Sequence, residues 1–399
     1  MKKFLSILFF AMFGILVFTV TGCGKAEELG VTDDQILIGT FQAMSGPLAV
    51  IGKPVADGMN AYFDYINQQG GINGRKIKLI IADDQFNPSK TVVEVKRMVE
   101  SDKVFALVCG LGTPGNLAVM DYVNNKQVPF VYQAAGTSKL SMPPKKYIFP
   151  VQPNYVLEGD LMAQYLVNDV KAQRIAIIYR NADDGIEEYE SLKKTMAKYG
   201  KELVAAIPIN TSATDFSIEV AKLAEVNPDA LVIMAWGGQS ANIVKQAKQY
   251  GMNDTLYIMT YANADATFPY LAGEAAEGAE VFAWLDIDFT DMNFLPFIIY
   301  KQKFGNDAMP NAYAIAGMVA AEVFVEGIKR AGKNLTREKL VKALESMQGW
   351  SGLMADKITY KPFKADDYTC RLGKRSMYVL KIKDGVWVKY HDWIDYSEK

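Results

Sequence analysis

The chain has 399 residues, with 43 Lys and Arg against 45 Asp and Glu, one His and three Cys. This length is natural for two domains, and the near-neutral charge gives no support for nucleic-acid binding, which needs a concentrated basic surface. Apart from a cysteine near the N-terminus, two cysteines and one histidine cannot build a conventional zinc site, so we expect neither metal nor cofactor.

The first residues are typical of an export signal. Two lysines precede an apolar run over residues 4–20, and small residues then lead to Cys23. This pattern is a secretory signal, and the cysteine stands where a bacterial lipobox has one. We expect a signal peptide over 1–22 and acylation of Cys23. A tether over 23–33 then holds the protein at the cell envelope, in the periplasm or on the outer face of the cytoplasmic membrane. An ordinary signal anchor is the alternative, although the run is short for a membrane span.

Apolar, β-branched runs then alternate with amphipathic stretches of helical length. Strands are expected at 36–40, 77–82, 105–109 and 130–132, and helices at 54–68, 88–100 and 116–125. The strand runs are continuously apolar rather than alternating, which indicates parallel sheets covered by helices on both faces. Cys109 ends one such run, so a buried thiol is expected there. A disulfide with Cys370 stays open.

The same alternation restarts after Pro153. The second series has expected strands at 175–179, 203–207, 230–235 and 256–259, and helices at 157–170, 186–199, 216–226 and 241–250. The tail has helices at 294–304, 313–331 and 336–346, and then a strand-rich end over 358–391. No later stretch approaches 18 consecutive apolar residues, so no second span is expected.

Two successive series predict an α/β protein with two doubly wound parallel-sheet lobes. The first break lies near residues 151–153, and the tail could return to the first lobe before it crosses to the second. The expected N-lobe is therefore 34–151 with 284–356, and the expected C-lobe is 152–283 with 357–399.

One segment is specific enough to suggest a family. Residues 67–79 read NQQGGINGRKIKL, with a helix stop, a tight Asn-Gly turn and a strand, and the acid pair Asp83-Asp84 follows. With 43–47 (AMSGP) and 272–278 (AGEAAEG), this resembles the branched-chain amino acid-binding proteins of ABC transporters, which are type I periplasmic binding proteins. The resemblance implies three crossovers between the lobes, near 151–153, 282–284 and 357–360.

The carboxyl ends of the strands would face each other across a cleft, where ligands of open α/β sheets bind. The loops there are rich in small residues, which let backbone N–H groups and helix N-termini approach an anion. We therefore expect a ligand carboxylate at Thr113, Ala134, Gly136 and Thr137. Aromatic and polar cleft residues complete the expected ligand-binding set: Ser45, Tyr155, Asp184, Trp236 and Tyr261.

The resemblance also reveals departures from the leucine-type binders. Tyr261 replaces a glutamate that pairs with the ligand's ammonium group, and a tyrosine of the first lobe becomes Ile51. A buried ammonium needs an anionic or carbonyl partner. Either Asp184 supplies that charge and the ligand is an amino acid, or Asp184 is a solvated loop acid and the aromatic side chains favour an aromatic or other organic acid.

Three classes of function remain. A solute-binding lipoprotein, monomeric and not an enzyme, would capture a small carboxylate-bearing ligand and deliver it to the permease subunits of an ABC importer. A sensing receptor of the same fold would instead hand its closed state to a sensor kinase or chemoreceptor. An exported enzyme is the remote alternative, because no nucleophile elbow, Walker loop or HExxH motif is present. Ligand identity, affinity, partner permease and envelope type stay open.

Overall fold

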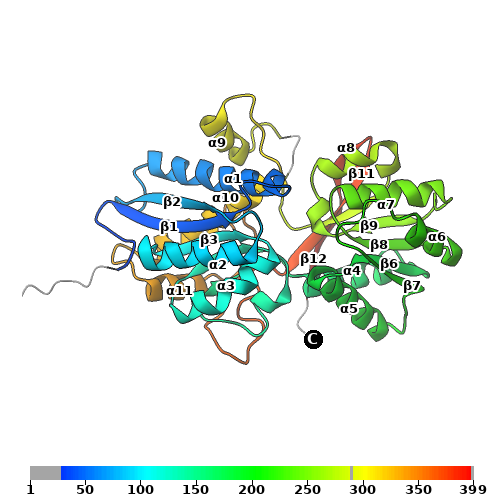
Figure 1. Ribbon diagram of the computed structural model, residues 1–399, viewed down its shortest axis with the longest axis horizontal. Helices are drawn as coiled ribbons and strands as arrows, with labels where there is room; N and C mark the ends of the chain where they lie inside the picture. Colours follow the sequence, from blue (N-terminus) through cyan, green and yellow to red (C-terminus); the bar gives the residue numbers. More distant parts are fainter. Residues whose placement is uncertain (1–27, 288–290, 397–399) are drawn as a thin grey trace, which may run out of the picture.

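Two α/β lobes lie side by side in the computed structural model, which describes residues 28–287 and 291–396 (Figure 1). The expected signal peptide and Cys23 lie outside these residues. Each lobe has its own sheet with helices on both faces, so the predicted architecture of two doubly wound lobes is confirmed.

The first sheet has the strand order β2-β1-β3-β4-β5, and all its neighbours are parallel. Its strands are β1 (Gln35–Gln42), β2 (Lys76–Asp83), β3 (Ala106–Leu111), β4 (Phe130–Ala134) and β5 (Ile148–Phe149). The helices of this lobe are α1 (Ala49–Gln68), α2 (Pro88–Lys96), α3 (Thr113–Asn125), α9 (Leu295–Phe304), α10 (Ala312–Ala331) and α11 (Arg337–Glu345). The core under α2 and α3 is separate from the core under α1, α10 and α11, because the sheet lies between them.

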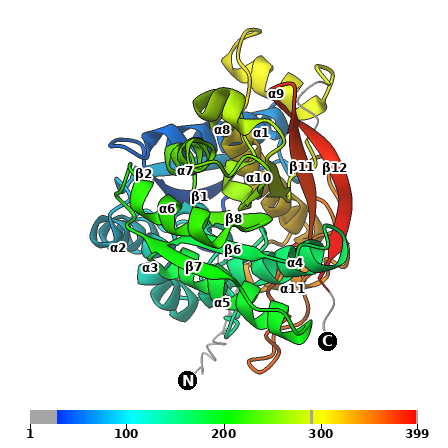
Figure 2. The same cartoon turned by 90° about the vertical axis from the view of Figure 1, so that its right-hand side faces the viewer.

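The second sheet has the order β12-β11-β10-β9-β8-β6-β7. Its parallel strands are β6 (Ile175–Arg180), β7 (Ala205–Ile209), β8 (Ala230–Met234), β9 (Leu256–Met259) and β10 (Glu280–Ala283). The hairpin β11 (Ser376–Lys383) and β12 (Val386–Asp395) adds an antiparallel edge, seen in red in Figure 2. The helices are α4 (Tyr155–Asn168), α5 (Asp183–Lys198), α6 (Ser217–Val226), α7 (Gly238–Gln249) and α8 (Thr267–Ala272).

The continuously apolar strands follow from burial on both faces. In β6, Ile175 and Ile177 belong to the core shared with α4 and α5, whereas Ala176 and Ile178 belong to the core under α6 and α7. Successive side chains of a strand point to opposite faces, so each face needs its own apolar residues. This requirement explains why the sequence showed no polar alternation.

Side-chain caps fix where several helices begin. Asn87, Asn154, Asn311 and Thr336 accept backbone N–H groups of the first turns of α2, α4, α10 and α11. Such a cap satisfies N–H groups that have no partner within the helix and contributes about 1 kcal/mol each. Asn154 and Asn311 precede helices whose first turns reach the space between the lobes, so these caps also hold the cleft in shape.

The third crossover comes later than the sequence placed it, at 357–360. The Tyr360 hydroxyl donates to the Pro150 carbonyl at 2.7 Å, and the fully buried Arg371 pairs with Glu345 at 2.6 Å. Both partners belong to the first lobe, since Pro150 follows β5 and Glu345 ends α11. A buried guanidinium needs a carboxylate partner, so Arg371 is held in this lobe. The chain therefore crosses between Arg371 and Ser376.

The two cysteines of the described chain are free and buried. Cys109 lies within β3 with no exposed surface, as its apolar run predicted. Burial raises the pKa of its thiol far above the ordinary value. No Cys109–Cys370 disulfide is present.

Helices α1 and α10 touch through paired glycines. A Cβ on Gly58 would lie 1.9 Å from the Ala314 carbonyl oxygen, and a Cβ on Gly317 would lie 2.1 Å from that of Val55. Neighbouring backbone cannot yield as a flexible side chain does, so these positions exclude any larger residue.

We expect Gly58→Ala to lower the free energy of unfolding by about 2 kcal/mol or more, because α1 and α10 must separate to admit the methyl group. Thermal unfolding measures the loss. Lys53→Ala, at an exposed position of the same helix, is the control and should change stability by less than about 0.5 kcal/mol. Equal melting temperatures for Gly58→Ala and the unsubstituted protein would contradict the close contact.

Candidate functional site

A cavity of about 840 Å³ lies between the two lobes. Its walls come from segments at the carboxyl ends of parallel strands, as the sequence predicted for a cleft. The first lobe contributes the loop before α1, the start of α3 and the end of β4. The second lobe contributes the end of β6 and the first turns of α4, α5 and α7. The volume falls in the usual range for small-molecule sites.

Six of the nine predicted ligand-binding residues line this cavity, and three do not. The lining residues are Thr113, Ala134, Tyr155, Asp184, Trp236 and Tyr261. The others are Ser45, Gly136 and Thr137. The hydroxyls of Ser45 and Thr137 donate to carboxylates, and Gly136 is covered by tyrosine side chains. Tyr313, at the start of α10, also lines the cavity, and its hydroxyl donates to the Ala262 carbonyl at 3.3 Å.

Ser45 and Thr137 are held by carboxylates outside the cavity. The Ser45 hydroxyl donates to Asp83 at 2.6 Å, within the turn after β1. The Thr137 hydroxyl and the Ser138 N–H donate to the two oxygens of Glu187, at 2.7 and 2.6 Å. Since Glu187 belongs to α5, this second contact joins the lobes and leaves Thr137 only 1% exposed. The sequence could not reveal either partner.

Gly136 is covered by two tyrosines of the second lobe. A Cβ there would lie 2.3 Å from the Tyr261 hydroxyl and 2.6 Å from a ring carbon of Tyr155. The two rings are stacked, with an interplanar angle of 9° and centroids 6.0 Å apart. Glycine at 136 thus lets the two tyrosines approach the first lobe. Their side chains lie against Gly136, where the sequence predicted a contact with a ligand.

A polar bridge crosses between the lobes beside these tyrosines. The Tyr132 hydroxyl donates to the Gln152 amide oxygen, and the Gln152 amide nitrogen donates to the Tyr261 hydroxyl, each at 2.7 Å. Tyr132 belongs to β4, Gln152 to the first crossover and Tyr261 to the segment after β9. Burial raises the pKa of Tyr132 and Tyr261 well above the ordinary value, so both hydroxyls stay protonated and able to donate.

Asp184 is not a solvated loop acid. It is 6% exposed, and its carboxylate pairs with Arg180 Nε at 2.9 Å. The solvated-loop alternative is therefore wrong: Asp184 lies in the first turn of α5, packed over the end of β6. The sequence analysis missed Arg180. Its position directly after an apolar strand is the same signal that selected Trp236, and could have found it.

Arg180 brings a positive charge to the cavity wall. Its guanidinium lies over the Trp236 ring, 4.3 Å from the centroid, and Nη1 donates to the Gln239 side chain at 3.0 Å. A planar guanidinium stacked in this way is fixed in orientation. Among the described residues Nη2 has no hydrogen-bond partner.

The fold matches that of known proteins. Residues 35–385 match the family of periplasmic binding proteins. The chain belongs to this family. Its relatives include the Leu/Ile/Val/Thr-binding protein of Salmonella typhimurium, 27% identical over 245 residues that cover 61% of this chain and 67% of that protein.

Solved structures of similar fold are named for different ligands. A branched-chain amino acid ABC transporter protein from Thermus thermophilus with bound valine has a TM-score of 0.81 and 20% identity, and the match covers 92% of this chain and 98% of the other. A fatty acid ABC transporter substrate-binding protein from Thermomonospora curvata has a TM-score of 0.76 and 24% identity, covering 93% and 95%. At these identities the similarity establishes the fold.

The other acids that line the cleft of this periplasmic binding protein also have partners. Asp183 pairs with Lys139 at 2.8 Å, a second contact between α5 and the first lobe. Asp265 accepts the backbone N–H and the hydroxyl of Thr267 at 2.9 and 3.0 Å, and burial raises its pKa. No carboxylate in the described lining is therefore without a partner.

The acid pair Asp83-Asp84 has a structural role. Asp84 accepts the Thr91 hydroxyl at 2.6 Å and the Phe86 N–H at 2.9 Å, which fixes the turn into α2. Over residues 28–287 and 291–396, no group of three His, Cys, Asp or Glu side chains could hold a metal ion. In the same ranges no helix is long and apolar enough to cross a bilayer.

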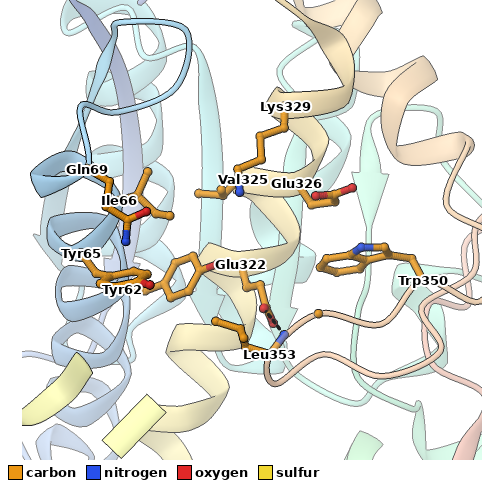
Figure 3. A pocket seen from close by; sticks show the side chains of 11 residues that line it. Tyr62, Tyr65, Ile66, Gln69, Glu322, Val325, Glu326, Lys329, Trp350 and Leu353 are labelled. Atoms are coloured by element: carbon orange, nitrogen blue, oxygen red, sulfur yellow. Dashed lines mark hydrogen bonds between the residues drawn. The ribbon is translucent and has the colours of Figure 1, made fainter. Parts of the chain in front are cut away.

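A second, smaller cavity of about 320 Å³ lies in the first lobe, away from the cleft (Figure 3). Figure 3 shows Tyr62, Glu322 and Trp350 around it, from α1, α10 and the loop after α11. Glu322 accepts the N–H groups of Met354 and Ala355 at 3.1 and 2.9 Å, so its carboxylate anchors that loop. The cavity therefore reflects how the loop is attached to α10.

Two glutamates are buried together behind Tyr261. Glu158 accepts the Tyr261 N–H at 2.8 Å and the Thr260 hydroxyl at 2.9 Å. Glu188 lies beside it, and neither residue has any exposed surface. Burial raises the pKa of Glu158 to about 8, and burial together with the charge of Glu158 raises the pKa of Glu188 well above its ordinary value. The pair therefore keeps at least one proton at neutral pH.

We expect stability to fall as the pH rises from about 4.5 to about 8, because the unfolded carboxyls ionise in this window while the folded pair holds its proton. Glu188→Gln removes one titrating group and lets an amide donate to Glu158. Its melting temperature should match the unsubstituted protein at pH 5 and exceed it at pH 8 by on the order of 2 °C. Glu190→Gln, exposed on the same helix, should leave the pH dependence unchanged. The same pH slope in Glu188→Gln would refute this account.

Proposed function

We propose that this chain captures a small carboxylate-bearing solute between its lobes and delivers it to the membrane subunits of an ABC importer. Membership of the periplasmic binding protein family supports an extracytoplasmic receptor. The cavity is shared by both lobes and contains a cation on its wall.

The proposal rests on the hydrogen-bond partners of the Arg180 guanidinium. Its Nε and Nη1 are bound to Asp184 and Gln239, which hold the guanidinium in place. Arg180 lines the cavity, and its Nη2 has no partner in the described chain. A carboxylate oxygen is the usual acceptor for such a group, and a charge-assisted hydrogen bond is about twice as strong as a neutral one.

The first lobe offers a second donor. Thr113 begins α3 and lines the cavity, and its hydroxyl has no hydrogen bond among the residues described. A helix N-terminus with a free hydroxyl also favours an anion. Donors from opposite lobes would reward closure, because ligand shifts the protein toward the closed form only by the amount that it binds this form better.

Ligands named for similar structures agree with this chemistry. Valine and fatty acids differ in their bodies but share a carboxylate. Acylation of Cys23, which lies outside the described residues, would tether the receptor near its permease and raise its effective concentration there.

Arg180→Gln should weaken binding of a carboxylate ligand at least tenfold, because the variant loses the cation while it keeps much of the side-chain length. The dissociation constant by calorimetry is the measurement, with the ligand taken from a thermal-shift screen of carboxylic acids. Lys245→Gln removes the same charge from an exposed position of α7 and should bind normally. Full affinity in Arg180→Gln, or no stabilising acid in the screen, would overturn the proposal.

A further inference from the structure

We propose that the loop after β4, residues 136–139, and the first turns of α5 form a latch that holds the two lobes together, with Glu187 as its central residue. This inference rests on the proposed function, in which the lobes close over a solute, and it names contacts that stabilise the closed form. These contacts lie outside the cavity, so the latch acts in the same way whatever solute the cavity receives.

Glu187 forms the central contact of the latch. Its two carboxylate oxygens accept the Thr137 hydroxyl at 2.7 Å and the Ser138 N–H at 2.6 Å. Both donors belong to the first lobe and the acceptor belongs to the second. Thr137 is buried, and hydrogen bonds to an ionised carboxylate are about twice as strong as neutral ones. The two bonds therefore connect the lobes at a point that is largely shielded from water.

A second pair on the same two segments contributes less. Lys139 Nζ and an Asp183 oxygen lie 2.8 Å apart, but about half of each side chain is exposed. Exposed ion pairs are screened by water and salt, and they add little to stability. The contact of Glu187 therefore dominates the latch, since one of its donors is a buried hydroxyl.

The central contact does not overlap the ligand cavity. Neither Thr137 nor Glu187 lines that cavity, so a solute need not displace their hydrogen bond. At its inner end the loop meets α4, where the Gly136 carbonyl accepts the Tyr155 N–H at 2.7 Å. Because all these bonds run from one lobe to the other, the lobes cannot separate along this loop without breaking them.

The latch makes part of closure independent of the solute. A ligand shifts the lobes toward the closed form only by the amount that it binds this form better. A contact that needs no solute instead sets the equilibrium from which the ligand starts. Weakening Glu187 should therefore open the protein even when no solute is added.

Glu187→Gln tests the latch, because it keeps the size of the side chain but replaces one acceptor oxygen with an NH₂ group. Small-angle X-ray scattering of the purified variant, with no solute added, should give a larger radius of gyration than the unsubstituted protein. Hydrogen exchange at the Tyr155 N–H, a bond between the lobes that the substitution does not touch, should be about tenfold faster. Glu190→Gln, exposed on the same helix, should match the unsubstituted protein in both measurements.

Two substitutions of Thr137 separate the latch from a general effect on folding. Thr137→Val keeps the shape of the side chain without its hydroxyl and should expand the protein, whereas Thr137→Ser keeps the hydroxyl and should leave it compact. Thermal unfolding confirms that each variant is folded. An unchanged radius of gyration in Glu187→Gln and Thr137→Val, or equal expansion in Thr137→Ser, overturns the latch. The proposed function would remain, since the screen of carboxylic acids tests it separately.

Discussion

A charge removed from water must find a partner, and this constraint decides what the cleft can hold. The two lobes meet along the carboxyl ends of their sheets, where Arg180 and Asp184 lie at the cavity wall with only 15% and 9% of their side chains exposed. Each stabilises the other, yet the guanidinium has more donors than one carboxylate and one amide oxygen use. Among the described residues, Nη2 of Arg180 and one oxygen of Asp184 have no hydrogen-bond partner. The pair is neutral overall and can still donate one hydrogen bond and accept another at the cavity wall.

The contacts between the lobes set how closure can proceed. The chain Tyr132–Gln152–Tyr261 lies at the first crossover. The contacts of Glu187 and Asp183 with the loop before β5 are further out on the first turns of α5. Both acids lie within one turn of Asp184 on α5, and Asp184 is paired with Arg180 at the end of β6. The contacts between the lobes and the Arg180–Asp184 pair are therefore mechanically connected.

The fold was largely predictable, and the site only in part. The strand cores were predicted because burial on both faces leaves long apolar runs such as residues 175–179. Helices α3, α5 and α7 begin about three residues earlier than their apolar periodicity suggested, because their first turns face the cleft rather than a core. Those turns carry Thr113 and Asp184.

Individual partners were not predictable for the same reason. Thr137 and Gly136 have the small, polar character of ligand-binding loops, but whether such a residue meets a solute or another segment depends on what the fold brings opposite. Here Glu187 and Tyr261 lie opposite, from elements 50 or more positions away in the sequence. The sequence pattern of one loop does not reveal which distant segment packs against it.

Backbone strain is found within two interior strands of the first sheet, β3 and β4. Cys109 and Tyr132 have φ of 57° although neither is glycine, and the β3–β4 pairing passes over both, from Val108↔Val131 to Gly110↔Gln133. Left-handed conformations cost of order 1 kcal/mol or more and persist only where the surroundings determine them. Both residues are buried, Cys109 fully and Tyr132 with 1% exposed, and the Tyr132 hydroxyl donates to Gln152 at 2.7 Å. Since Tyr132 also lines the cavity, the packing of the core and the shape of the cavity depend on the same strand.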